Sequence, residues 1–129
     1  MMDRKEYALS LRKNGYNCCQ AVLSAFGEES GLPDETLRRM GAAFGGGMGN
    51  MNGPCGALCG AQMALGLICF QGRPLHAAAR KLQTGFVEKT GGQICREIKG
   101  IDTGKMLCPC EDCIRNAVTV LEASLEAEA

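Results

Sequence analysis

The feature that most constrains this chain is a long segment without a single charged side chain. No Asp, Glu, Lys or Arg occurs between Arg39 and Arg73, and the residues from Pro54 to Phe70 are almost all apolar or small. A stretch of this length could form a short membrane-spanning helix, but it contains Gln62, three glycines and three cysteines and lacks basic anchors close to its ends. We therefore expect a helix buried at the centre of a folded domain, without membrane insertion.

The remaining segments have the residue spacing of amphipathic helices. In the stretches that follow Asn17 and Pro33, small or apolar residues stand at positions i, i+3, i+4 and i+7. No run of residues alternates between polar and apolar as a β-strand would. The expected helices cover Asp3 to Lys13, Cys18 to near Gly31, Pro33 to Phe44, Pro54 to Phe70, Pro74 to Gly91 and Cys110 to Leu125. We expect a loop at Gly45 to Gly53 and a short piece of one or two turns at Ile94 to Gly100.

The chain of 129 residues is long enough to bury one hydrophobic core and too short for two. The sequence therefore predicts an all-α protein, with residues 1–129 forming a single compact domain of five or six helices around a buried central apolar helix. An uncharged segment this long leaves apolar surface that so small a domain cannot cover by itself. For that reason we also expect a homodimer.

Charge and aromatic content exclude several functions. Fourteen basic and fourteen acidic side chains cancel, so no net field attracts nucleic acid or an anionic membrane. Only 5% of the residues are aromatic and none is Trp, which disfavours a surface for base stacking. The chain opens with charged residues where a secretory signal would be apolar, so we expect a cytoplasmic protein. In a reducing compartment, nine cysteines indicate metal ligands or redox groups rather than structural disulfides.

Cys55 has the strongest local argument for reactivity among these cysteines. It follows Pro54 at a predicted helix start, where unpaired backbone N–H groups point toward its side chain. The helix dipole contributes about 0.3 to 2 kcal/mol, which lowers a thiol pKa from about 8.5 to between about 7 and 8.3. We therefore expect Cys55 to be the most acidic thiol of the chain.

Gly56 and Gly60 lie four residues apart in the same predicted helix, so one helix face lacks side chains. Another helix, a cluster or a ligand could pack closely against that face, and we include both glycines as candidate cofactor-binding residues. The alternative is that small residues only permit close packing between helices.

A second cysteine cluster, Cys108-Pro109-Cys110-Glu111-Asp112-Cys113, stands at the start of the last predicted helix. Its CxxC part places two sulfurs on adjacent helical turns, a geometry that suits either dithiol exchange or metal binding. No His follows Cys113, so covalent attachment of a c-type haem is excluded. The βαβ setting of a thioredoxin-like motif is also missing.

Two other features carry no function by themselves. The glycine-rich segment from Gly45 to Gly53 lacks the Gly-Lys-Ser/Thr ending of a phosphate-binding loop and contains no basic residue. His76 is the only histidine, so zinc sites with two or three histidines are excluded, and we interpret it as a surface residue rather than the partner of a catalytic cysteine.

Several motifs together resemble the C_GCAxxG_C_C family of redox-active proteins. The resemblance covers about residues 14–120 and is carried by Gly15-Tyr16-Asn17-Cys18-Cys19-Gln20-Ala21-Val22-Leu23, Phe44-Gly45-Gly46-Gly47-Met48-Gly49, Cys55-Gly56-Ala57-Leu58-Cys59-Gly60, Ile94-Cys95-Arg96-Glu97 and Cys113. The family label writes Gly-Cys-Ala where this chain has Cys-Gly-Ala. The resemblance implies that the family's four cysteines fall on Cys18, Cys55, Cys95 and Cys113.

These four cysteines lie in four different predicted segments, and three of them stand close to a predicted helix start, where we expect the backbone N–H dipoles to stabilise thiolates. If they converge, the site is held by the whole fold, unlike a local ferredoxin run or a zinc knuckle. The other five cysteines are additions to the family pattern: Cys19, Cys59, Cys69, Cys108 and Cys110. Of these, Cys59, Cys108 and Cys110 could substitute for a member of the set.

Three functions remain open at this point. The first is a redox protein that uses thiol–disulfide exchange or electron transfer at Cys18, Cys55, Cys95 and Cys113. Such a protein would be a thiol-dependent oxidoreductase or would exchange electrons with a redox partner protein. The second is a metal protein in which the same four thiolates hold an iron–sulfur cluster or zinc. The third is a non-catalytic helical interaction module whose cysteines have no chemical role.

Overall fold

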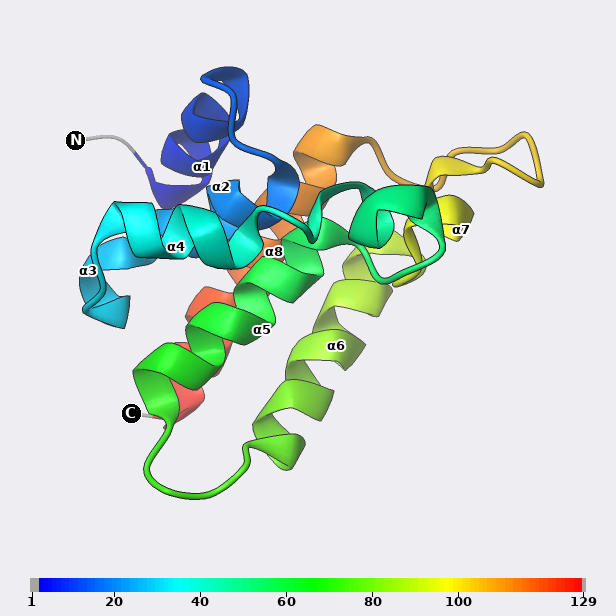
Figure 1. Cartoon of the computed structure of the whole chain (residues 1–129). Helices are drawn as coiled ribbons and strands as arrows, with labels where there is room; N and C mark the ends of the chain where they lie inside the picture. Colours follow the sequence, from blue (N-terminus) through cyan, green and yellow to red (C-terminus); the bar gives the residue numbers. More distant parts are fainter. Residues whose placement is uncertain (1–2, 129) are drawn as a thin grey trace.

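The computed structural model describes residues 3–128 and contains helices but no strand within that range, which confirms the all-α prediction (Figure 1). Its elements are α1 (Arg4–Lys13), α2 (Cys18–Ala25), α3 (Gly27–Ser30), α4 (Asp34–Gly41), the π-helical turn η1 (Gly47–Met51), α5 (Gly56–Cys69), α6 (His76–Thr90), α7 (Cys95–Lys99) and α8 (Cys110–Glu128). The buried apolar side chains form one cluster, as expected for a single domain.

The number of helical segments within residues 3–128 exceeds the predicted five or six because the chain adds short ones. The helix expected from Cys18 to near Gly31 is divided at Phe26, whose backbone N–H bonds to the carbonyl oxygens of Leu23 and Ser24 in place of a regular α-helical turn. The expected loop after Phe44 also contains the π-helical turn η1. The long helices and their approximate limits agree with the prediction.

Helix α5 occupies the centre of the fold, as its lack of charge predicted. It packs against α2, α6 and α8, and every residue from Gly56 to Cys69 is buried or half-buried. In Figure 1, α5 lies between α4 and α6, with α8 behind it. Leu58 and Leu65 are almost completely buried. Within residues 3–128, no helix has both the length and the apolar character needed to cross a bilayer.

The starts of several helices are held by contacts between distant parts of the chain. The Asn17 side chain accepts a hydrogen bond from the Gln20 N–H, and the Gln20 side chain accepts one from the Asn17 N–H. The Asn17 amide also donates to the Gly41 and Ala42 carbonyls at the end of α4. This capping box therefore fixes the start of α2 against the segment that leads into η1.

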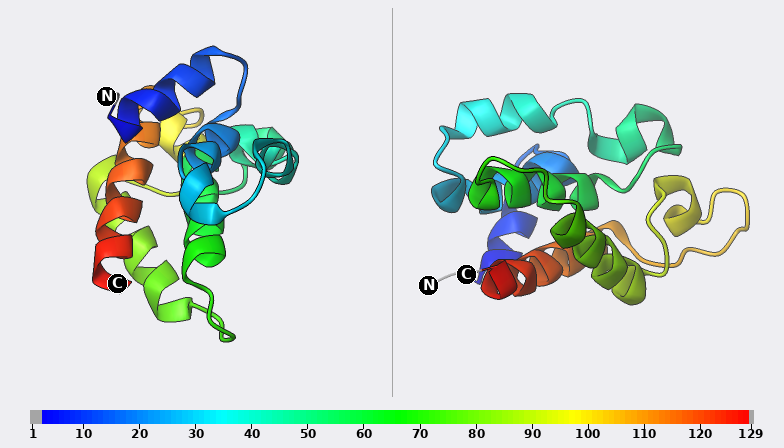
Figure 2. Two further views of the ribbon diagram at one scale, coloured as in Figure 1. Left: turned by 90° about the vertical axis from the view of Figure 1, so that its left-hand side faces the viewer. Right: turned by 90° about the horizontal axis from the view of Figure 1, so that it is seen from below.

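A two-residue antiparallel bridge joins the segment before α5 to the segment before α7. Pro54 pairs with Ile94, the Cys55 N–H donates to the Gln93 carbonyl at 2.7 Å, and the Cys95 N–H donates to the Gly53 carbonyl at 3.0 Å. The starts of α5 and α7 are therefore side by side. Figure 2 shows α7 and the π-helical turn η1 at the same end of the molecule.

Candidate functional site

The four cysteines that carry the resemblance all lie at or next to helix starts in the structure. Cys18 is the first residue of α2, Cys55 is the N-cap of α5, Cys95 is the first residue of α7, and Cys113 lies in the first turn of α8. Cys55, Cys95 and Cys113 are buried and Cys18 is half-buried. The starts of α2, α7 and α8 lie around the beginning of α5.

The bridge between Pro54 and Ile94 brings Cys55 and Cys95 together. Because side chains alternate across a strand pair, both cysteines project from the same face of the bridge, as diagonal neighbours. Such neighbours lie on the order of 7–8 Å apart. The loop before α5 also covers Cys95: a Cβ atom on Gly47, which has a φ of +62°, would lie 2.5 Å from the Cys95 Cβ. Only glycine fits at this position.

Cys18 lies on the other side of the α5 start. Its sulfur is packed against Gly56, where any added side-chain carbon would overlap it. Burial raises the pKa of the Cys18 thiol above its ordinary value, although a hydrogen bond from the Gly46 backbone partly opposes this effect. Burial likewise raises the pKa of Cys95. The prediction that helix starts stabilise thiolates is therefore wrong for these two residues, because desolvation outweighs the helix dipole.

Cys55 has the opposite behaviour, with its pKa lowered to about 6. The main cause is a hydrogen bond from the Cys113 thiol, and the backbone N–H groups of Ala57 and Leu58 at the start of α5 donate two more. Together these donors outweigh the cost of burial at a residue that is only 6% exposed. The value lies below the range of about 7 to 8.3 expected from a helix dipole alone, because the Cys113 side chain adds a donor to those of the helix start.

Cys113 is the complementary member of this pair. Its hydrogen bond to Cys55 and its burial both raise its pKa, so it keeps its proton when Cys55 is ionised. The Cys113 sulfur also lies 3.9 Å from the Cys108 carbonyl oxygen. Two neighbouring thiols, one ionised and one protonated, are the groups that thiol–disulfide exchange requires.

Lys99 is a member of this region that sequence reasoning missed. Its ammonium, at the end of α7, donates a hydrogen bond to the Cys110 sulfur, and its charge also lowers the pKa of Cys55. The pKa of Lys99 is raised although partial burial acts against this, because Cys110, Cys113 and Cys55 stabilise its charge. Lys99 lies far from Cys55 in sequence, so no local pattern identified it. Its only sequence signal is that it closes the short helix that Cys95 begins.

The sequence also matches a known family over most of its length. The matching family is described as "Putative redox-active protein (C_GCAxxG_C_C)", and the match covers residues 16–124. The chain belongs to the C_GCAxxG_C_C family. No significant match was found among curated proteins or among solved structures.

The cysteines that this member adds to the C_GCAxxG_C_C pattern differ in position. Cys110 is exposed beside Lys99, and Cys108 is buried with its sulfur 3.8 Å from the Asn116 amide nitrogen. Burial raises the pKa of Cys19 to about 12 and that of Cys59 to about 11. Cys69 lies at the far end of α5, roughly 20 Å from Cys55 at 1.5 Å per residue, and is therefore outside the cluster.

Gly56 and Gly60 both face α2 in the structure. A Cβ on Gly56 would overlap the Cys18 sulfur, and a Cβ on Gly60 would lie 2.5 Å from the Cys19 carbonyl oxygen. The space beside these glycines is therefore filled by α2. The two glycines therefore allow α2 and α5 to pack closely against each other.

Metal binding was the alternative use for these thiols. Within residues 3–128, no three Cys, His, Asp or Glu side chains are arranged closely enough to hold a metal ion. A zinc ion would require the thiols to move closer together than they are in this structure. His76 is exposed at the start of α6, as expected for a surface residue.

Proposed function

We propose that this chain is a thiol–disulfide redox protein in which Cys55 and Cys113 alternate between a dithiol and a disulfide. The observation that carries this proposal is the electrostatic coupling of the two neighbouring thiols at the start of α5, which lowers the pKa of Cys55 and raises that of Cys113. The thiolate is the reactive form of cysteine, so Cys55 is the nucleophile of the pair. Membership of a redox-active family agrees with this assignment.

Access to the pair requires a third sulfur, since Cys55 and Cys113 are 6% and 2% exposed. We assign this role to Cys110, which is exposed, hydrogen-bonded to Lys99 and one helical turn before Cys113. The partner in this scheme is a disulfide on another protein or a small molecule.

The proposed exchange takes place in three steps. The Cys110 sulfur attacks the partner disulfide, forms a mixed disulfide and gives its proton to the departing sulfur. The Cys113 sulfur then attacks Cys110 while the neighbouring Cys55 thiolate takes its proton, and the second partner sulfur accepts that proton from Cys55 as it leaves as a thiol. Finally the Cys55 thiolate attacks Cys113, which leaves a Cys55–Cys113 disulfide and a Cys110 thiolate beside the Lys99 ammonium. Two electrons pass from the protein to the partner, and the partner leaves as two thiols.

Peptide mapping of the oxidised protein tests this proposal. The reduced full-length chain is treated anaerobically with oxidised glutathione, and its disulfides are identified by mass spectrometry. The expected product contains a Cys55–Cys113 disulfide. Cys110→Ser should slow its formation without changing the reduction potential of the pair, whereas Cys69→Ser, at the far end of α5, should change neither.

Two outcomes would contradict the proposal. The first is an oxidised protein in which Cys55 remains a free thiol while other cysteines are paired. The second is stoichiometric zinc, or iron with sulfide, in the anaerobically purified chain, because either would favour the metal-protein alternative.

A further inference from the structure

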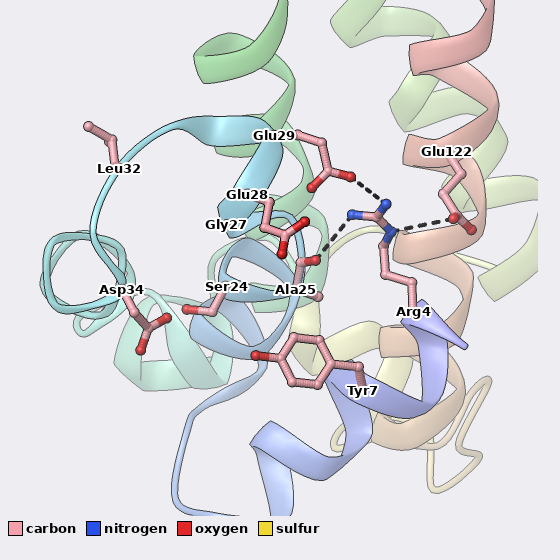
Figure 3. Close-up of a pocket in the computed structure, with 10 residues that line it drawn as sticks. All are labelled: Arg4, Tyr7, Ser24, Ala25, Gly27, Glu28, Glu29, Leu32, Asp34 and Glu122. Atoms are coloured by element: carbon pink, nitrogen blue, oxygen red, sulfur yellow. Dashed lines mark hydrogen bonds and ion pairs between the residues drawn. The ribbon is translucent and has the colours of Figure 1, made fainter. Parts of the chain in front are cut away.

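An open pocket of about 770 Å³ lies away from the cysteines, between α1, α2, α3, the start of α4 and α8 (Figure 3). None of its lining residues is a cysteine, so it is independent of the proposed thiol chemistry. Its volume falls within the range of about 300–1,000 Å³ that is usual for small-molecule sites.

Negative charge dominates the lining of this pocket. Among the residues that the structure describes, 3–128, the lining contains one cation, Arg4, and four carboxylates: Glu28, Glu29, Asp34 and Glu122. The formal sum of these five groups is 1 − 4 = −3. A cationic ligand would therefore be attracted to the pocket by its net charge.

The Arg4 side chain forms several contacts along one wall of the pocket. Its guanidinium forms ion pairs with Glu29 and Glu122, donates to the Ala25 carbonyl at 3.1 Å and stacks 4.2 Å from the centre of the Phe26 ring. The hydrogen bond with Glu29 raises the Arg4 pKa, and it lowers that of Glu29. Arg4 therefore pairs with two of the four carboxylates, and each of its three guanidinium nitrogens already has a partner.

The other polar groups of the pocket are left for a ligand. Glu28 has no ion-pair partner within residues 3–128, and Asp34 accepts a single hydrogen bond, from the Tyr16 hydroxyl at 2.7 Å. Ser24 is only 5% exposed, and its hydroxyl has no hydrogen-bond partner in the described part of the chain. Figure 3 shows this hydroxyl pointing toward the Asp34 side of the pocket. A buried hydroxyl without a partner is rare and calls for an explanation such as a bound ligand.

We propose that this pocket binds a short aliphatic diammonium ion. Each primary ammonium offers three donors, and the uncompensated carboxylates Glu28 and Asp34 provide one anionic partner for each. The Ser24 hydroxyl supplies a further acceptor on the Asp34 side of the pocket. The methylene chain of the ligand lies against apolar atoms of Leu32, and the Tyr7 ring offers a face for cation–π contact.

Titration of the full chain with 1,4-diaminobutane, followed by amide chemical shifts, tests this inference. We expect saturable shifts confined to residues around the pocket. Butane-1,4-diol, which has the same length and no charge, should cause no such shifts. Sodium chloride at matched ionic strength should not reproduce them.

Substitutions then identify the groups that bind. Glu28→Gln and Asp34→Asn should each weaken binding about fivefold, the upper range for an exposed ion pair. Glu88→Gln removes an exposed carboxylate on α6, outside the pocket, and should leave the affinity unchanged. Ser24→Ala should raise the thermal midpoint of the free protein and also weaken diamine binding. If the Ser24 hydroxyl had a purely structural role, its removal would change the thermal midpoint and leave the affinity for the diamine unchanged.

Three results would overturn the proposal. The first is the absence of saturable shifts with the diamine. The second is an equal loss of affinity in Glu28→Gln and Glu88→Gln, because that would indicate general charge attraction. The third is binding of N-acetyl-lysine amide as tight as that of the diamine, since a second ammonium would then contribute nothing.

Discussion

Replacing Cys113 by alanine should make Cys55 a weaker acid. In the native protein the Cys113 thiol is the main stabiliser of the Cys55 thiolate, ahead of the two backbone donors and the charge of Lys99. Alanine removes this donor and leaves the start of α5 in place. The substitution therefore isolates the contribution of the sulfur–sulfur contact.

The size of the effect follows from the strength of a hydrogen bond to a charged group, about 1.5–3 kcal/mol. Since 1.36 kcal/mol corresponds to one pKa unit, the Cys55 pKa should rise by about one to two units. Starting from about 6, it should reach about 7 to 8. At pH 7 the ionised fraction of Cys55 would fall from about 90% to between about 10% and 50%.

Iodoacetamide is smaller than a disulfide substrate, and the rate at which it alkylates the 6% exposed Cys55, compared between variants, reports changes in this fraction. The reduced protein is labelled anaerobically over a range of pH, and modification of Cys55 is followed by mass spectrometry. At pH 7 the Cys113→Ala variant should react about two- to tenfold more slowly at Cys55. Its pH profile should be shifted toward alkaline pH.

Two further variants separate the hydrogen bond from other effects of substitution. Cys113→Ser keeps an O–H donor, so the Cys55 pKa should remain closer to that of the native protein. Cys59→Ala removes a thiol one turn along α5 whose own pKa is raised to about 11, and should leave Cys55 unchanged. If Cys55 still titrates near 6 in Cys113→Ala, the contact between the sulfurs is not what stabilises the thiolate.

Three other predictions follow from the same structure. The free energy of unfolding of the reduced protein should rise by about 2 kcal/mol from pH 6 to pH 8, because unfolded Cys55 keeps a proton that the folded form has lost. Below pH 6 this stabilisation is lost, and urea unfolding of Cys55→Ala should show no such rise. Gly56→Ala should destabilise the fold by about 1–3 kcal/mol through overlap with the Cys18 sulfur. The matched Gly66→Ala, with no neighbour within 4 Å, should stabilise it by up to about 1 kcal/mol in the same urea assay. Finally, Lys99→Met should raise the Cys55 pKa by less than Cys113→Ala does, whereas Lys99→Arg should preserve it in the alkylation assay.

Much of the fold could be predicted because its causes are local in sequence. The uncharged segment had to be buried, and it became the central helix α5. Helix starts at Cys18 and Cys110 and the stop at Gly91 were recognisable from capping and turn residues. The break at Phe26 was not predicted, because the apolar pattern continues through it.

The candidate site was only partly accessible to the same reasoning. The position of Cys55 before a helix start indicated a lowered pKa, because the backbone donors of a helix depend only on local structure. The same expectation of a lowered pKa was wrong for Cys18 and Cys95, because burial raises their pKa and burial depends on what packs against them.

The sequence alone thus determined which segments are helical, which helix is central and which cysteine has backbone donors. Tertiary structure decided which sulfur meets Cys55, which cation supports it and how the segments before α5 and α7 pair. Cys113 and Lys99 lie more than forty residues from Cys55 along the chain. Their contacts arise only when separate helices pack around α5, and a pattern of spacing within one segment carries no information about them.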